Sequence, residues 1–406
     1  MRRSIELTCV LLAACASDAT QPERSPSVAA AAEALSANVH ELPMLTWDEL
    51  SITGRDAGYS ARIGSTSAWV FGDTFNQVPA ADGSFLSNTW SWTQDVRADD
   101  GIGPFQQATD ANGAPLQLLP YDPAGWEIAY NDLHECTDDA VPCTCQANDD
   151  ECGDRFALWP GPVVTYTDND EVERALVLYT ELYVGRADYD YRVRGTSIAR
   201  WDDLRGQATR TPTAVFGPEH PAMTAGALRY TARGVEYLYV YTCAPGAVLT
   251  ADCRVGRAPF ARGEDEDALD AILDRASWRF YVGGDPDSAS SWSTDPDDAV
   301  VVMTANTTLS VQPNAYLEQL TAVYAQFLTN DVYLQTAPRP EGPWSGHASE
   351  PLFDVGPIER QADYYAIVHP EFDVASGKQV YITTSHPDGT NLFRMPTRLF
   401  EVTLNK

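Results

Sequence analysis

Positive charge is scarce in this chain of 406 residues. Twenty-seven Lys and Arg residues stand against 58 Asp and Glu residues, so the formal net charge is −31. A field of this sign repels nucleic acid and anionic lipid, and the composition therefore excludes polyphosphate partners. It is compatible with a soluble protein in an open medium and carries no information about the fold.

Long apolar runs are also missing. No stretch approaches the roughly 18 apolar residues that a membrane helix needs. The N-terminus instead has the layout of an export signal, because Arg2 and Arg3 precede a short apolar stretch at residues 7–14. The letters LAAC at residues 12–15 match the small-residue cleavage pattern of a bacterial lipoprotein.

We therefore expect three segments along the chain. These are a lipoprotein-type signal peptide at residues 1–15, a flexible tether at residues 16–44 and a folded domain at residues 45–406. Such a protein would be exported and held at the outer cell surface or in the periplasm through a lipid on Cys15, or else secreted. The lipid anchor would be its sole contact with a membrane, and we expect a monomer.

Several common chemical motifs are absent from the sequence. It contains no nucleotide-binding glycine loop, no zinc-protease motif and no credible serine triad. The Asp-rich stretches at residues 168–171 and 295–298 could hold calcium, but they lack the regular alternation of a calcium loop and are better interpreted as solvated turns. We expect neither a cofactor nor a bound metal.

Six cysteines remain beyond Cys9 and Cys15, an even number that indicates disulfides in an exported protein. Cys243 and Cys253 are expected to pair across a short loop. The other four allow three connectivities, and zinc is the alternative, although spacings of six, one and six residues are not a usual zinc pattern. These four are Cys136, Cys143, Cys145 and Cys152. They lie in a long polar stretch, about residues 97–153, that predicts an elaborated, disulfide-rich loop.

The aromatic content and the strand pattern predict an all-β fold. Nineteen Tyr, 13 Phe and 10 Trp residues favour sheets. Short apolar runs recur as five units of three or four strands, with the second strands centred near residues 70, 178, 239, 323 and 381. This repetition is typical of a five-bladed β-propeller, with a β-sandwich as the alternative. A short helical insert is predicted at residues 264–275, where three apolar residues share one face.

The stretch at residues 54–75 predicts a hairpin that carries two aspartates. An alternating run at residues 59–63 and a continuous apolar run at residues 68–71 flank a Gly-Ser turn. Asp56 and Asp73 stand at the outer ends of these two antiparallel strands, where they can approach each other. Two facing carboxylates are the equipment of glycoside hydrolysis. The alternative is that both are ordinary turn aspartates.

The letters GRDAGYS and WVFGDTF of this hairpin resemble the opening motifs of the family called domain of unknown function 4185, also glycoside hydrolase family 183. Three later motifs follow in the expected order: WPGP at residues 159–162, GPWS at 342–345 and HPE at 369–371. The resemblance spans about residues 45–404.

The resemblance implies a secreted bacterial five-bladed propeller. Characterised members of the family are endo-acting D-arabinanases that cut the arabinan of mycobacterial arabinogalactan and lipoarabinomannan with retention of configuration. The family's catalytic pair corresponds to Asp56 in GRD and Asp73 in GDTF. We assign Asp73 as the nucleophile and Asp56 as the acid/base, and we expect a polysaccharide substrate.

Eight further residues are candidates for binding the sugar: Arg55, Tyr59, Trp159, Glu181, Asn314, Tyr316, His369 and Glu371. Several of them have a structural alternative. Arg55 could form a surface ion pair, His369 could be a core histidine bonded to backbone, and Trp159 could pack inside a blade. Asn314 and Tyr316 could serve packing alone, and Glu181 could be an auxiliary carboxylate.

Two other functions stay open at this point. The first is a non-catalytic propeller that binds glycan or protein at the cell surface, since propellers serve as binding platforms as readily as enzymes. The second is an enzyme for another furanoside or a sialic-acid-like sugar. Arg55 is the single arginine of the GRDAGYS motif, which argues against a carboxylate-bearing sugar because such sugars usually need several arginines.

Overall fold

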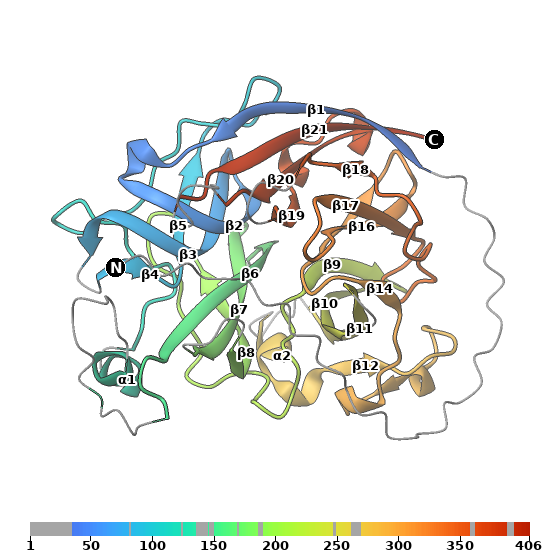
Figure 1. The fold of residues 1–406 in the computed structure, drawn as a ribbon. Helices are drawn as coiled ribbons and strands as arrows, with labels where there is room; N and C mark the ends of the chain where they lie inside the picture. The colour runs from blue at the N-terminus through green and yellow to red at the C-terminus, as the bar shows by residue number, and fades with distance from the viewer. Residues whose placement is uncertain are drawn as a thin grey trace. The chain divides into compact units, whose positions relative to one another are not determined.

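Each of the five predicted units forms its own antiparallel sheet, and the chain is a five-bladed β-propeller (Figure 1). The computed structural model describes residues 35–80, 83–122, 125–134, 145, 150–168, 170–185, 190–246, 249–260, 269–357, 362–387 and 394–406. All of these belong to one compact unit, Glu33–Lys406. The predicted signal peptide, Cys15, and residues 16–34 of the predicted tether lie outside the described residues.

The blades follow one another along the chain. The first contains β2 (Ile52–Ile63), β3 (Thr66–Ala80), β4 (Gly83–Leu86) and β5 (Thr89–Thr93). The second contains β6 (Arg155–Thr167), β7 (Glu173–Val184) and β8 (Tyr191–Trp201). The third contains β9 (Gly226–Ala232), β10 (Val235–Pro245), β11 (Ala251–Pro259), β12 (Arg279–Tyr281), β13 (Trp292–Ser293) and β14 (Met303–Ala305).

The last two blades complete the ring. The fourth contains β15 (Ser310–Asn314), β16 (Gln319–Ala325), β17 (Asp331–Ala337) and β18 (Phe353–Asp354). The fifth contains β19 (Tyr364–Val368), β20 (Gln379–Ser385), β21 (Thr397–Asn405) and the N-terminal strand β1 (Ser36–Leu45). The predicted second strands are confirmed, because their centres fall in β3, β7, β10, β16 and β20. The first strands β2, β6, β9, β15 and β19 contact one another in this order around the ring.

The strand β1 differs from the prediction for residues 36–44, which were assigned to a flexible tether. It pairs with β21 in antiparallel register, with Val39 opposite Val402 and Leu42 opposite Leu399. Leu42 is buried, so the segment contributes to the core. The Ala- and Ser-rich residues before it conceal this short apolar alternation in the sequence. The first strand of the chain therefore forms the edge of the fifth blade, next to the last strand.

The third blade also differs from the prediction. The strand next to β10 is β11, which lies where the sequence predicted a short loop. The strand predicted to be third in this blade is β12, which pairs with β11 and not with β10. Cys243 and Cys253 face each other across β10 and β11 and form the predicted disulfide. Charged residues such as Arg254 and Arg257 alternate with apolar ones along β11, which hides the strand in the sequence.

The polar insertion carries a helix that the sequence did not predict, α1 (Trp126–His134). Cys145 and Cys152 form a disulfide, whereas Cys136 and Cys143 lie outside the described residues. Within the predicted helical insert, the described part contains the single turn α2 (Asp270–Leu273). Short 3-10 helices occupy turns at Asp48–Leu50, Arg275–Ser277, Ala289–Ser291, Pro296–Asp298, Pro370–Phe372 and Ala375–Gly377.

The core consists of apolar layers between neighbouring blades, as expected when sheets pack face to face. Between the first and second blades, Val70 and Trp90 join Val177 and Tyr179. Between the first and fifth blades, Trp69 and Phe71 of β3 join Tyr381 and Leu399. Alternate residues of β3 thus pack against the second blade on one face and the fifth blade on the other. Ala68, Trp69, Val70 and Phe71 are all fully buried.

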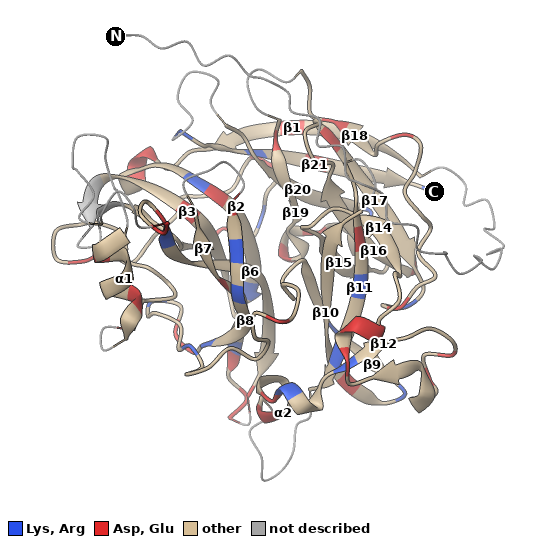
Figure 2. Ribbon diagram, turned by 60° about the horizontal axis from the view of Figure 1, so that its bottom comes forward, with Lys and Arg blue, Asp and Glu red and all other residues tan. Residues whose placement is uncertain are grey.

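Two general features of the described residues bear on partners. Acidic residues are scattered through the ribbon rather than gathered in one patch (Figure 2). Over the ranges that the structure describes, no helix combines the length and apolarity needed to span a membrane.

Candidate active site

The predicted hairpin places the two aspartates opposite each other. Arg55 pairs with Thr74 and Ala57 with Phe71, so Asp56 alone stands opposite both Gly72 and Asp73. Two residues facing one define a β-bulge, a feature that re-aims side chains near active sites. A Cβ on Gly72 would lie 3.5 Å from the Cβ of Asp56, so a small residue at this position keeps the space beside the carboxyl open.

The backbone directly after Asp56 is held in an unusual conformation. Ala57 has a φ of 61°, in the left-handed region that non-glycine residues rarely adopt. Its N–H donates a hydrogen bond of 3.0 Å to the hydroxyl of Ser385 in the fifth blade. Strained backbone of this kind persists where the surroundings hold it, and it clusters at functional sites.

Asp73 is held by two donors from β6. Arg155 donates from Nη2 to Oδ2 of Asp73 at 3.0 Å, and the indole Nε1 of Trp159 donates to Oδ1 at 2.8 Å. The guanidinium of Arg155 also lies 4.0 Å above the ring of Phe85. Burial raises the pKa of Asp73, while Arg155 and Trp159 oppose this effect because they stabilise the charged carboxylate.

Asp56 has a different environment. Tyr364 of β19 donates to Oδ1 of Asp56 at 2.6 Å. Burial, and then the negative charge of Asp73, raise the pKa of Asp56 to about 7, against the opposing effects of Tyr364 and Arg155. Asp56 therefore retains a proton near neutral pH while its partner Asp73 has a cation beside it. Two carboxyls with two environments are what an acid and a nucleophile require.

A group of tyrosines surrounds this pair. Tyr365 follows Tyr364 on β19, with ring centroids 4.9 Å apart, and has a φ of 57°. Burial and then the charge of Asp56 raise the pKa of Tyr365 well above its usual range, with smaller effects of Tyr59, Asp73 and Tyr191. Tyr59 is itself buried. The candidate site is thus built by β2 and β3, β6, β8 and β19.

His369 and Glu371 lie in a separate cluster between the first and fifth blades. The two ring nitrogens of His369 lie 2.6 Å from the hydroxyl of Ser60 and 2.7 Å from that of Thr383, and the ring stacks on Trp69. Burial lowers the pKa of His369 to about 3, so the ring is neutral. Ser67 donates to Glu371 at 2.7 Å. His369 is a core histidine, bonded to hydroxyls rather than to the backbone as expected.

Arg55 is buried within the first blade. Its guanidinium donates to Ser91 at 2.6 Å and to Gln107 at 2.8 Å, and it lies 4.5 Å above the ring of Phe71. Burial lowers the pKa of Arg55 to about 9. The side chain thus faces away from solvent, in neither a surface ion pair nor a position to contact sugar.

Asn314 and Tyr316 lie at the turn between β15 and β16. The amide of Asn314 donates to the carbonyl of Gly377 at 2.8 Å, and its oxygen accepts from the N–H of Leu317. The ring of Tyr316 packs beside Lys406 at the end of the chain. Both residues have partners within the fourth and fifth blades, which fits the packing alternative.

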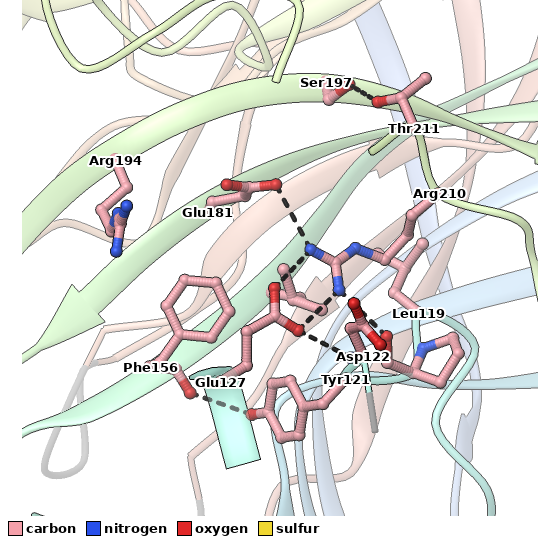
Figure 3. A network of polar contacts seen from close by, with 12 residues as sticks. Leu119, Tyr121, Asp122, Glu127, Phe156, Glu181, Arg194, Ser197, Arg210 and Thr211 are labelled. Atoms are coloured by element: carbon pink, nitrogen blue, oxygen red, sulfur yellow. Dashed lines mark hydrogen bonds and ion pairs between the residues drawn. The ribbon is translucent and has the colours of Figure 1, made fainter. Parts of the chain in front are cut away.

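Glu181 belongs to a polar network that docks α1 onto the second blade (Figure 3). Arg210 binds the two carboxylate oxygens of Glu127 at 2.7 and 2.8 Å and lies 3.4 Å from Glu181. Burial raises the pKa of Glu181. The sequence suggested that Glu181 is an auxiliary carboxylate of the site. In the structure its charged neighbour is Arg210.

Of the residues named from the sequence, the structure brings together Asp56, Asp73, Trp159 and Tyr59. Sequence reasoning missed Arg155, Tyr191, Tyr364 and Tyr365. A usable signal existed for the last two: a Tyr-Tyr doublet occupies the first strand of the fifth unit, as Asp56 occupies that of the first.

A family model described as domain of unknown function (DUF4185) matches residues 185–395, slightly more than half of the chain. The matched stretch includes Tyr191, Tyr364 and Tyr365 but neither aspartate. A search of curated proteins gave no match.

Several solved structures resemble the chain at low identity. The alpha-L-arabinofuranosidase PaAbf62A from Podospora anserina, in complex with cellotriose, is 11% identical with a TM-score of 0.43, covering 91% of this chain and 98% of that one. A GH43_1 enzyme from Xanthomonas citri is 10% identical with a TM-score of 0.44, covering 91% and 90%. The catalytic domain of a Coprinopsis cinerea GH62 alpha-L-arabinofuranosidase is 10% identical with a TM-score of 0.40, covering 91% and 96%. Likenesses at this level carry no argument about function.

Proposed function

The chain belongs to the family of the domain of unknown function DUF4185, a description without an activity, and we propose from its site that it is a glycoside hydrolase. The observation that carries the proposal is the pair Asp56 and Asp73. Asp56 has a pKa of about 7 and a hydroxyl donor, whereas Asp73 has an arginine and an indole N–H. Two carboxyls in contrasting environments are the equipment of glycosidic cleavage.

In this mechanism Asp56 is the acid/base. Tyr364 occupies Oδ1 of Asp56, so the proton resides on Oδ2 and is given to the departing glycosidic oxygen. Asp73, ionised beside Arg155, attacks the anomeric carbon and forms a covalent glycosyl-enzyme. The Asp56 carboxylate then takes a proton from water, which attacks the same carbon and releases the sugar with its configuration retained.

The finer proposal is an endo-acting enzyme that cuts arabinofuranosidic bonds of a cell-wall arabinan. It rests on the resemblance of the GRDAGYS and WVFGDTF motifs, together with the position of their aspartates in the site. We also propose that the protein is exported, with a lipid on Cys15 as its membrane contact, on the strength of the LAAC pattern. We propose in addition that it is a monomer. Mass spectrometry of the mature N-terminus tests the lipid, and light scattering tests the monomer.

The activity test is digestion of purified arabinogalactan, with released oligosaccharides separated by chromatography. Wild type is compared with Asp56→Asn and Asp73→Asn, and Asp100→Asn serves as the matched control because Asp100 is exposed. Folding of each variant is checked by thermal melting. We expect release by wild type and the control and a loss of at least about a thousandfold in the two site variants. A folded wild type that cuts neither this polymer nor other furanosides would favour a glycan-binding propeller.

A further inference from the structure

We propose that Tyr191 forms a sugar-binding subsite at the rim of the second blade, next to Asp73. This inference rests on the proposed hydrolase function and adds a residue that contacts the substrate. Tyr191 is the first residue of β8, where it stands opposite Val184 at the end of the sheet. Its side chain was not among the candidates drawn from the sequence.

The position of Tyr191 follows from its contact with Trp159. Its ring packs edge-on against the indole of Trp159, with centroids 5.0 Å apart, and that indole donates a hydrogen bond to Asp73. Tyr191 also contributes, after burial, Asp56, Tyr59 and Asp73, to the raised pKa of Tyr365. Tyr191 therefore borders the space in front of the aspartate pair.

Exposure distinguishes Tyr191 from the other rings of the site. It is 48% exposed, whereas Trp159, Tyr364 and Tyr365 are partly buried and Tyr59 is buried. Among the tyrosines in the described ranges, Tyr191 alone is exposed. A tyrosine ring has an apolar face and a hydroxyl, and ligand sites use such rings to contact a substrate while still offering a hydrogen bond. A sugar ring has the same combination of apolar C–H face and hydroxyl edge.

The indole of Trp159 has a different use. Its N–H is bound to Asp73, which fixes the ring as a positioning group for the carboxylate. We therefore assign to Tyr191, and not to Trp159, the sugar-stacking role that the sequence suggested for Trp159. The competing explanation is that Tyr191 merely supports Trp159. In that case its loss would disturb Asp73 and lower kcat, whereas loss of a subsite raises KM.

The test measures kcat and KM on linear arabinan oligosaccharides for wild type, Tyr191→Ala and Tyr191→Phe. Phe327→Ala, which removes another exposed aromatic ring on the fourth blade, is the matched control. We expect Tyr191→Ala to raise KM about tenfold with kcat within about twofold of wild type. Tyr191→Phe keeps the ring and should restore most of the affinity, and the control should match wild type.

Binding supplies a second readout. In the Asp56→Asn background, Tyr191→Ala should weaken oligosaccharide binding by the same factor in calorimetry. An unchanged KM and unchanged binding, or a fall in kcat alone, would overturn the subsite while wild-type activity still supports the hydrolase. A wild type without activity on any glycan would instead overturn the hydrolase, and the subsite with it.

Discussion

Tyr364 of the fifth blade donates a hydrogen bond of 2.6 Å to Oδ1 of Asp56 in the first blade, across 308 positions of sequence. Asp73 is held in turn by Arg155 of the second blade. The two carboxyls of one hairpin thus depend on donors from the two neighbouring blades, one neutral and one cationic. This difference in donors is what separates their proposed roles.

Removing the hydroxyl of Tyr364 should shift the pH dependence of the reaction. The bond stabilises the ionised form of Asp56, so Tyr364→Phe should raise its pKa from about 7 by about one unit. Activity that needs the protonated acid is lost as pH rises through this pKa, and the alkaline limb of kcat should therefore move to higher pH. Tyr230→Phe is the control, and an alkaline limb that stays in place would contradict the role of Tyr364.

Arg155→Gln should move the acid limb of the pH profile to higher pH. Loss of the guanidinium removes a group that lowers the pKa of Asp73. This pKa should therefore rise further, and Asp73, the proposed nucleophile, should ionise only at higher pH. We expect kcat/KM at pH 6 to fall about a hundredfold. Arg97→Gln breaks an exposed pair with Asp99 and should change nothing measurable. Equal activity of the two variants would remove Arg155 from the mechanism.

Asp373 should make stability depend on pH. Burial, and then the charge of Glu371, raise its pKa in the folded protein to about 8, against about 4 in an unfolded chain. The folded state favours the protonated acid. The contribution of Asp373 to the free energy of unfolding is therefore largest below pH 4 and is lost as the pH rises through 8. Asp373→Asn should raise the melting temperature at pH 8 by about 2 °C or more, with a smaller gain at pH 5. A gain of equal size at both pH values would show that the charge is not the cause.

The disulfide of the third blade should contribute to stability without touching the chemistry. Cys243 and Cys253 face each other across β10 and β11. The double substitution Cys243→Ala and Cys253→Ala should lower the free energy of unfolding by about 2 kcal/mol, measured in urea. The strand pairing restrains the same residues, so kcat should be unchanged. A matching loss of activity would mean that the third blade is coupled to the site.

The hairpin could be predicted because its information is local. Alternating residues, a Gly-Ser turn and a continuous apolar run define β2 and β3, and the antiparallel pairing then brings Asp56 near Asp73. The five units were predictable for the same reason, since each is a repeat of short strands. The strand β11 escaped detection because charged residues alternate with apolar ones along it, although it lies inside the third sheet.

The neighbours of the pair could not be predicted, because ring closure alone brings them together. Nothing within β6 says that Arg155 meets Asp73, or within β19 that Tyr364 meets Asp56. His369 shows the reverse case: its motif stands in the expected order, but the ring is enclosed by Ser60, Thr383 and Trp69. Composition identified the residue types, whereas the packing of blades decided which of them share a site.

The pairing of β1 with β21 gives the protein an order of assembly. During synthesis both aspartates emerge early, yet β1 has no partner strand, and Asp56 has no tyrosine, until almost the whole chain has been made. A ribosome-bound fragment that ends before the fifth blade would contain both carboxyls but would lack Tyr364, the hydrogen-bond donor to Asp56. If the pair acts as proposed, such a fragment should lack hydrolase activity, because Asp56 gains its hydrogen-bond donor only when β19 is present.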